Sequence, residues 1–319
     1  MSEIEGKPLR LEDSLNKLPA RIAQIRKMNY RALANLESDQ TALVERWASI
    51  GPGLKEIIRS GVSSLRPEIS ILESEISQRR MDTVYNTMRL TNLEIRLSTL
   101  QLRLSDLSAH VSKSLGDIEG KLQSVEQDVA LAEGTLNLIS QASFQWKEKE
   151  FPIYAVNGKD MNRDAEGVIT LTNLRFLFES EKEVVLKKRL FIATEKKKVR
   201  ETLLDQPVGI IDSVTKGRVG LLAGAGLFIT FKPQSGLQEM KFDVKGHEAD
   251  SVIRFYNYIV SGQADAEASS VEGPPPPPTD EKPKITVCPR CGAPFTEEIY
   301  RGQTSVQCRY CGAVIPLTQ

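Results

Sequence analysis

Cys288-Pro-Arg-Cys291-Gly-Ala and Cys308-Arg-Tyr-Cys311-Gly-Ala are the two stretches that decide the fold at one end of this 319-residue chain. The four cysteines of the chain all lie in these two pairs, and 16 residues separate the inner two. Each pair is expected to project two thiolates from a tight turn, and the glycine that follows permits a positive φ beneath a metal. Four sulfur ligands close a tetrahedron without leaving a position for substrate. The spacing therefore predicts one structural metal ion.

Zinc is the metal that this pattern favours, in a small zinc ribbon over residues 285–319. Iron is the rival, because rubredoxins use similar knuckles, but their loops are longer and their cores richer in aromatic residues than Phe295, Tyr300 and Tyr310 provide. Two redox-active thiol pairs would need a βαβ context that so short a segment cannot supply. The predicted zinc ligands are Cys288, Cys291, Cys308 and Cys311.

Length and charge bound the rest of the chain. At 319 residues, two or three folding units are expected, and 42 basic residues balance 42 acidic ones, so electrostatic binding has to be local. The N-terminus lacks a basic segment followed by an apolar one, and the longest nearly uncharged apolar stretch, residues 219–231, is too short for a membrane helix. These features predict a cytoplasmic protein.

Residues 1–149 have a helical pattern with a heptad repeat from Ile69. Ten of the fourteen a and d positions up to Ser114 are apolar, and the polar ones include a weak point at Arg79, Thr83 and Asn86. The pattern predicts a helical coiled coil, on the order of 70 Å long over residues 69–114, that joins chains into a homo-oligomer. An intramolecular helical bundle would use the same seam.

Two further features qualify the helical region. The seam slips by four residues near Gly116 and Gly120, a stutter that either runs straight through or marks a hairpin. An earlier 3,4-spaced run, residues 15–25, stops before a break predicted at residues 51–53, so a first helix could fold back on the long one. That run consists of Leu15, Leu18, Ile22 and Ile25.

Residues 150–262 change to strand-like texture. Alternating β-branched, aromatic and polar residues from Val168 to Phe178 predict strand structure, and shorter strand candidates follow. The turns are expected at residues 157–158, 216–217 and 233–236, and an amphipathic helix over residues 249–260 ends the segment. The further candidate strands are residues 184–186, 209–211, 227–231 and 240–244.

The run Gly167-Val-Ile-Thr-Leu-Thr-Asn-Leu-Arg-Phe-Leu-Phe178, marked by Leu-Thr-Asn-x-Arg, resembles the signature of GRAM and related pleckstrin-homology-like domains. The resemblance covers about a third of the chain. It implies a small β-barrel or sandwich with a C-terminal capping helix, and a protein or lipid ligand. The insertion over residues 190–208 and the glycine run at residues 220–226 depart from the compact pattern of these domains.

A basic cluster follows this run. Eight basic residues face four glutamates between Glu181 and Glu201, and pleckstrin-homology-like domains often present such residues to lipid headgroups. A merely solvated face is the alternative. The candidate anionic-surface residues are Lys187, Lys188, Arg189, Lys196, Lys197, Lys198 and Arg200.

Residues 263–284 are predicted to be a linker, because Pro274 begins a run of five prolines that favours polyproline II. The run acts either as a spacer or as a docking site for proline-recognising domains.

The ribbon beyond it has four basic and two acidic side chains from Lys284 onward, and four thiolates with one zinc add about two negative charges. The net charge is therefore near zero, which disfavours nucleic-acid binding.

The chain is thus predicted to have a multidomain α + β fold and to act as a cytoplasmic scaffold or adaptor for protein partners. Its two histidines, His110 and His247, stand in no recognisable catalytic arrangement, so no enzymatic activity is expected. Two alternatives stay open. One is a peripheral protein of anionic membranes, and the other is a nucleic-acid-associated factor that uses the ribbon.

Overall fold

The computed structural model describes residues 2–77, 86–189, 192–219, 224–271, 285–295 and 298–317, with backbone alone for residues 86–89, 183–189 and 192–198. The described chain separates into two compact units. The first comprises residues 1–23 and 35–129, and the second residues 24–34 and 130–319. The second unit therefore contains both the strand-rich region and the cysteine ribbon.

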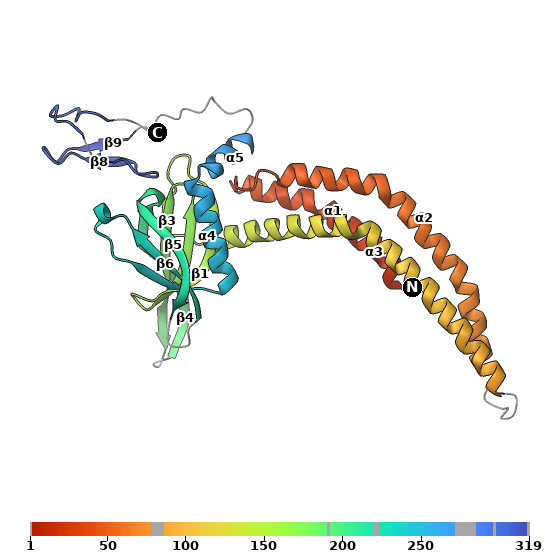
Figure 1. The fold of residues 1–319 in the computed structure, drawn as a ribbon. Coiled ribbons are helices and arrows are strands. Elements are labelled where there is room, and N and C mark those ends of the chain that lie inside the picture. The colour runs from red at the N-terminus through yellow and green to blue at the C-terminus, as the bar shows by residue number, and fades with distance from the viewer. Residues whose placement is uncertain are drawn as a thin grey trace. The chain divides into compact units, whose positions relative to one another are not determined.

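The first unit is built by three long helices, α1 (Ser2–Lys27), α2 (Leu36–Ser77) and α3 (Asn86–Ile139) (Figure 1). Ion pairs join Glu5 to Arg66 and Glu12 to Lys55, so α1 and α2 are antiparallel. The expected 3,4-spaced residues of α1, Leu15, Leu18, Ile22 and Ile25, are all buried. The prediction that a first helix folds back is confirmed.

Two predictions for the long helices are wrong. The Gly51-Pro52-Gly53 break does not occur, because α2 runs through it. The continuous arm over residues 69–114 is also wrong, because α2 ends at Ser77 and pairs antiparallel with α3 through Glu68–Arg103 and Glu75–Arg96 ion pairs. Helices α2 and α3 thus run in opposite directions on either side of the polar positions of the seam. Arg79 and Thr83 lie outside the described residues.

The seam is used inside the chain, as the intramolecular alternative anticipated. Leu65, Leu72 and Leu100 form a buried cluster against Ile69, Leu93 and Leu104. The stutter runs straight through α3, and its later register, Leu115, Ile118, Leu122, Val125, Val129 and Leu136, is buried. Three apolar a positions stay about half exposed or more: Ile76 at 59%, Leu90 at 48% and Leu97 at 49%.

A seven-stranded antiparallel sheet dominates the second unit, in the order β4-β3-β2-β1-β7-β6-β5. Only two residue pairs, beginning with Lys159 and Asp243, join β1 to β7, so the sheet divides into a four-stranded and a three-stranded part. The strands are β1 (Pro152–Asp160), β2 (Ala165–Thr172), β3 (Arg175–Arg189), β4 (Ile192–Pro207), β5 (Ile211–Val219), β6 (Gly224–Phe231) and β7 (Met240–Asp243).

The core lies where the two parts of the sheet meet. Phe242 of β7 packs against Phe178 of β3, with ring centroids 5.1 Å apart. In the order of the sheet β1 and β2 lie between these two strands, so the contact joins its two parts across the core. Helix α4 (Gly246–Val260) closes the unit with Phe255 stacked on Tyr154 and the Tyr256 hydroxyl donating to the Ile211 carbonyl. Either a small β-barrel or a sandwich was predicted. Within the described residues no pairing between β4 and β5 closes the sheet into a barrel, so the open, folded sheet with its terminal helix corresponds to the sandwich.

Some local predictions were displaced. Residues 157–158 and 216–217, expected as turns, lie inside β1 and β5, whereas the Pro233–Ser235 turn ending in left-handed Gly236 is confirmed. Gly209 lies in a short 3-10 helix, Val208–Ile210, and not in a strand. The predicted linker begins instead with helix α5 (Gln263–Val271), which buries Ala264 and Ala268. The proline run lies outside the described residues.

Candidate metal centre

The two cysteine knuckles have the same local geometry. The Cys288 amide donates to the Ala293 carbonyl and the Gly292 amide to the Cys288 carbonyl, and the same two bonds recur from Cys308 to Ala313 and from Gly312 to Cys308. Gly292 and Gly312 have φ of 71° and 69°, a left-handed conformation that strongly favours glycine. The positive φ predicted for both glycines is confirmed.

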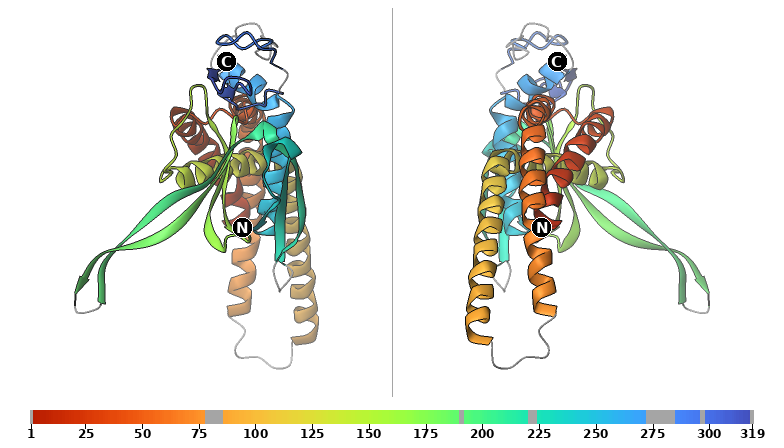
Figure 2. Two further views of the ribbon diagram at one scale, coloured as in Figure 1. Left: turned by 90° about the vertical axis from the view of Figure 1, so that its left-hand side faces the viewer. Right: turned by 90° about the vertical axis from the view of Figure 1, so that its right-hand side faces the viewer.

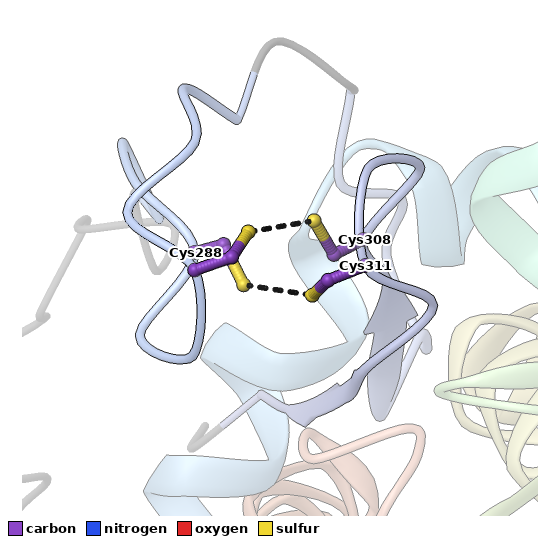
Figure 3. Close-up of side chains that lie close together, drawn as sticks. Cys288, Cys308 and Cys311 are labelled. Carbon is purple, nitrogen blue, oxygen red and sulfur yellow. Dashed lines mark hydrogen bonds between the residues drawn. The ribbon is translucent and has the colours of Figure 1, made fainter.

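The four sulfur atoms meet between the knuckles (Figure 3). The Cys288 and Cys311 sulfurs lie 3.8 Å apart and those of Cys291 and Cys308 lie 3.7 Å apart, and all four lie within 4.8 Å of one another. These distances are too long for disulfides, whose sulfurs are about 2.05 Å apart. A tetrahedron with metal–sulfur bonds of roughly 2.3 Å has edges of about 3.8 Å, so the cluster has the dimensions of a four-thiolate metal site.

Hydrogen bonding divides the thiols. The backbone N–H of Cys291, directed at the Cys288 sulfur, lowers the pKa of Cys288 to about 7. The backbone N–H of Ala293 has the largest single effect on Cys291 and acts to lower its pKa, but the hydrogen bonds with the other three thiols and the burial of the group together outweigh it and raise that pKa to about 12. Negative charge on all four sulfurs therefore needs a cation among them. A divalent metal would supply that charge.

The ribbon around the cysteines has little core of its own. Its hydrophobic cluster consists of Cys288, Val306, Cys308, Ile315 and Leu317, and strands β8 (Ser305–Gln307) and β9 (Val314–Pro316) are short. Segments below roughly 40 residues usually need a metal or disulfides to fold. The cysteine cluster therefore fits a structural metal ion, whose removal would unfold the ribbon.

The Leu-Thr-Asn-x-Arg motif forms the turn between β2 and β3, which we call the Thr172–Arg175 corner. Arg175 is 3% exposed and donates from Nε and Nη2 to the two oxygens of Glu150, at 2.8 and 2.7 Å, and Glu150 is fully buried. Its Nη1 donates to Asp205 at 2.6 Å. Burial alone would lower the pKa of Arg175, but Glu150 and Asp205 raise it. The motif's arginine is thus a buried structural ion pair.

The other polar residues of the corner also fasten chain segments together. The Thr172 hydroxyl donates to Glu150 at 2.6 Å, and the Asn173 side chain accepts from the Phe151 amide at 3.0 Å and donates to Asp265 of α5 at 3.3 Å. These bonds hold the chain entering β1 and helix α5 against the corner. The motif thus stabilises the fold, and its side chains do not point to an open site.

The predicted basic cluster divides into two groups. Arg200 does not belong to an exposed surface, because its side chain is 6% exposed and bound to Glu181. The other six candidates, Lys187, Lys188, Arg189, Lys196, Lys197 and Lys198, lie on the β3–β4 hairpin where the structure describes the backbone alone. That hairpin extends beyond the other strands (Figure 2).

Sequence reasoning missed Glu150, Asp205 and Gly209. The two carboxylates complete the Arg175 cluster from positions 25 and 30 residues away. Gly209 adjoins the ribbon, with its amide donating to the Arg301 carbonyl at 3.1 Å. The available signal for the two carboxylates was the position of Arg175 between two apolar strands, because a buried arginine needs buried partners of opposite charge.

The fold comprises a helical region, an antiparallel seven-stranded sheet followed by a helix, and a C-terminal cluster of four cysteines. Among solved structures, the Vps36 N-terminal PH domain aligns with 38% of this chain and 90% of its own, at 13% identity and a TM-score of 0.25. That similarity is too low to carry a functional argument. No family model and no curated protein matches the chain.

None of the helices within the described ranges is long and apolar enough to cross a membrane.

Proposed function

We propose that this chain is a non-enzymatic cytoplasmic adaptor that holds protein partners together and carries one structural zinc ion. The observation that carries the proposal is the cysteine cluster, in which four thiols occupy all the corners of a tetrahedron. Such a set leaves no open coordination position, and an open position is what zinc catalysis requires. A closed site supports a role in stabilising a binding module.

The seven-stranded sheet with helices α4 and α5, which we call the sheet unit, supports the same role. The most unusual polar residues of its motif, Thr172, Asn173 and Arg175, have their hydrogen-bonding groups engaged with Glu150, Asp205 and neighbouring backbone. Groups occupied in this way are not poised for acid–base work on a substrate. A rigid sheet unit is suited instead to presenting surfaces and edges to protein partners.

Self-association is part of the proposal. The half-exposed Leu90 and Leu97 belong to the same seam as the leucines that pack between α2 and α3, and Ile76 of this seam is exposed as well. Pairing of two such hairpins would cover these leucines and give each adaptor two copies of every binding surface.

Purification of the intact chain from its own cells tests the adaptor role, with the Cys288→Ser/Cys308→Ser variant as comparison. The adaptor role predicts a defined set of co-purifying proteins, part of which depends on the ribbon. Zinc analysis of the same samples should find one ion per wild-type chain. Recovery of the wild-type chain alone, after chemical cross-linking in the cell, would contradict the adaptor role.

A second candidate function is weak binding to anionic membranes. The observation that favours it is the extension of the β3–β4 hairpin, because it carries six basic residues beyond the rest of the sheet (Figure 2). Each well-placed lysine or arginine contributes about 1 kcal/mol near an anionic surface.

Sedimentation with phosphatidylserine vesicles at low salt tests the second function. Lys196→Glu/Lys197→Glu/Lys198→Glu should abolish binding, and raised salt should release the wild type. Glutamate at the exposed Lys27, Lys113 and Lys245 makes the same charge change elsewhere and should have a smaller effect. Wild-type protein that does not sediment with these vesicles at low salt would contradict the membrane function, and the adaptor role would then be the one remaining proposal.

A further inference from the structure

The loop between the two knuckles contacts the sheet unit at the Thr172–Arg175 corner. Arg301 donates from Nε to the Asn173 carbonyl at 3.1 Å, and its guanidinium also pairs with Asp265 of α5. Nearby, Lys232 lies over the Tyr300 ring at 4.6 Å and 3.7 Å from the Glu298 carboxylate. The ribbon is therefore attached by several polar contacts and not only by its linker.

Two glycines make this contact close. A methyl group on Gly209 would lie 2.4 Å from the Arg301 nitrogen, and one on Gly302 would lie 1.9 Å from the Leu174 carbonyl oxygen. No residue with a side chain fits either place without moving the two backbones apart. The Gly209 amide also donates to the Arg301 carbonyl. The two surfaces are thus matched in shape as well as in charge.

The geometry of the loop depends on the ribbon being folded. The Gln303 amide donates to the Tyr300 carbonyl and the Gln303 side chain accepts from the Tyr300 amide, which defines a turn with left-handed Gly302 at its end. Strand β8 begins two residues after Gln303 and leads directly to Cys308. Because two of the five residues in the hydrophobic cluster of the ribbon are cysteines, metal loss would release this turn.

We propose that the Thr172–Arg175 corner, with Gly209 and Asp265, is a docking site for the Tyr300–Gln303 turn of the same chain, and that metal binding and docking are thermodynamically coupled. Metal fixes the turn so that it fits the corner. By reciprocity, the docked corner raises the affinity of the ribbon for metal. Metal loss exposes the corner to other proteins. The inference rests on the metal site of the proposed function but not on the adaptor role.

Amide hydrogen exchange, resolved by NMR on the full chain, tests the first half. The Gly209 amide bonds to the ribbon, whereas the adjacent Val208 amide bonds to Leu174 inside the sheet unit at 2.9 Å. Removing zinc with a chelator should speed exchange at Gly209 by about tenfold or more, and leave Val208 within about twofold. Equal protection of Gly209 with and without zinc would overturn the coupling.

Gly209→Ala tests the second half. Gly209 does not have a positive φ, so alanine is compatible with its backbone and should hinder docking alone. Metal affinity should fall on the order of tenfold, within the range of roughly 5- to 150-fold typical of coupled sites. Gly246→Ala is the matched control, because its added methyl group meets nothing nearer than 3.5 Å. Arg301→Met, which removes the guanidinium contacts, should resemble Gly209→Ala.

The outcomes separate the two proposals. Wild-type protein that binds no zinc would defeat the metal site itself. One zinc per chain, with affinity unchanged in Gly209→Ala and Arg301→Met, would defeat the docking inference alone. A dimer that Gly209→Ala dissociates would show that the turn docks on a second chain, and so overturn docking within one chain.

Discussion

Replacement of Arg175 by methionine tests the role assigned to the Leu-Thr-Asn-x-Arg motif. The substitution keeps an unbranched side chain of similar reach and removes the four hydrogen bonds that the guanidinium donates to Glu150, Asp205 and the Gln145 carbonyl. It leaves the fully buried Glu150 without its cation. We expect a large loss in the unfolding free energy of the sheet unit.

The structure sets the size of the loss. Removing one partner of a buried ion pair costs about 3–5 kcal/mol. Glu150 keeps bonds from the Thr172 hydroxyl and the Lys147 amide, at 2.6 and 2.7 Å, and Asp205 is 42% exposed and can be hydrated. These features place the expected loss near the lower end, at about 3 kcal/mol.

Urea unfolding followed by Trp146 fluorescence measures the effect, in a Trp47→Phe background so that the second unit alone is reported. Lys182→Met is the matched control on the same strand, because its ion pair with Glu201 is exposed and should contribute less than about 1 kcal/mol. Arg175→Met/Glu150→Leu should recover part of the loss, since the stranded carboxylate is gone. A loss in Arg175→Met no larger than that in Lys182→Met would refute the assigned role.

Further outcomes concern the metal and the helices. Chelation should unfold the ribbon and leave the helical circular dichroism unchanged; a parallel loss of helix would contradict an independently stable helical unit. Zinc affinity should decline as pH falls below about 7, because the Cys288 thiolate then takes up a proton. Zinc binding near pH 8 should release protons from thiols such as Cys291, and an indicator dye in weak buffer can measure this release. A pH-independent affinity would exclude thiolate ligation. Leu97→Lys should dissociate any oligomer with little loss of stability, whereas Leu100→Ala, at a position 7% exposed, should lower the unfolding free energy by about 2–5 kcal/mol. Sedimentation measures the first effect and thermal unfolding the second. An oligomer that survives Leu97→Lys would place self-association elsewhere.

Local patterns in the sequence were enough to predict several features. The knuckles follow from cysteine and glycine spacing, because a tight turn and its hydrogen bonds involve residues only a few positions apart. The buried stripe of α1 and the late register of α3 follow from helical periodicity. The strand structure on either side of Asn173 follows from the alternation of apolar and polar residues.

Tertiary structure decided the features that depend on distant partners. A heptad seam specifies an apolar stripe but not what covers it, so only the packing of Leu72 near Leu100 showed that the chain folds back on itself. Arg175 became a buried structural residue only when Glu150 and Asp205 came within hydrogen-bonding distance. Gly209 and Arg301 are 92 residues apart, and no local signal pairs them. Such contacts arise from the closing of long loops, whose outcome depends on the shape and charge of whole surfaces and not on a nearby pattern of residues.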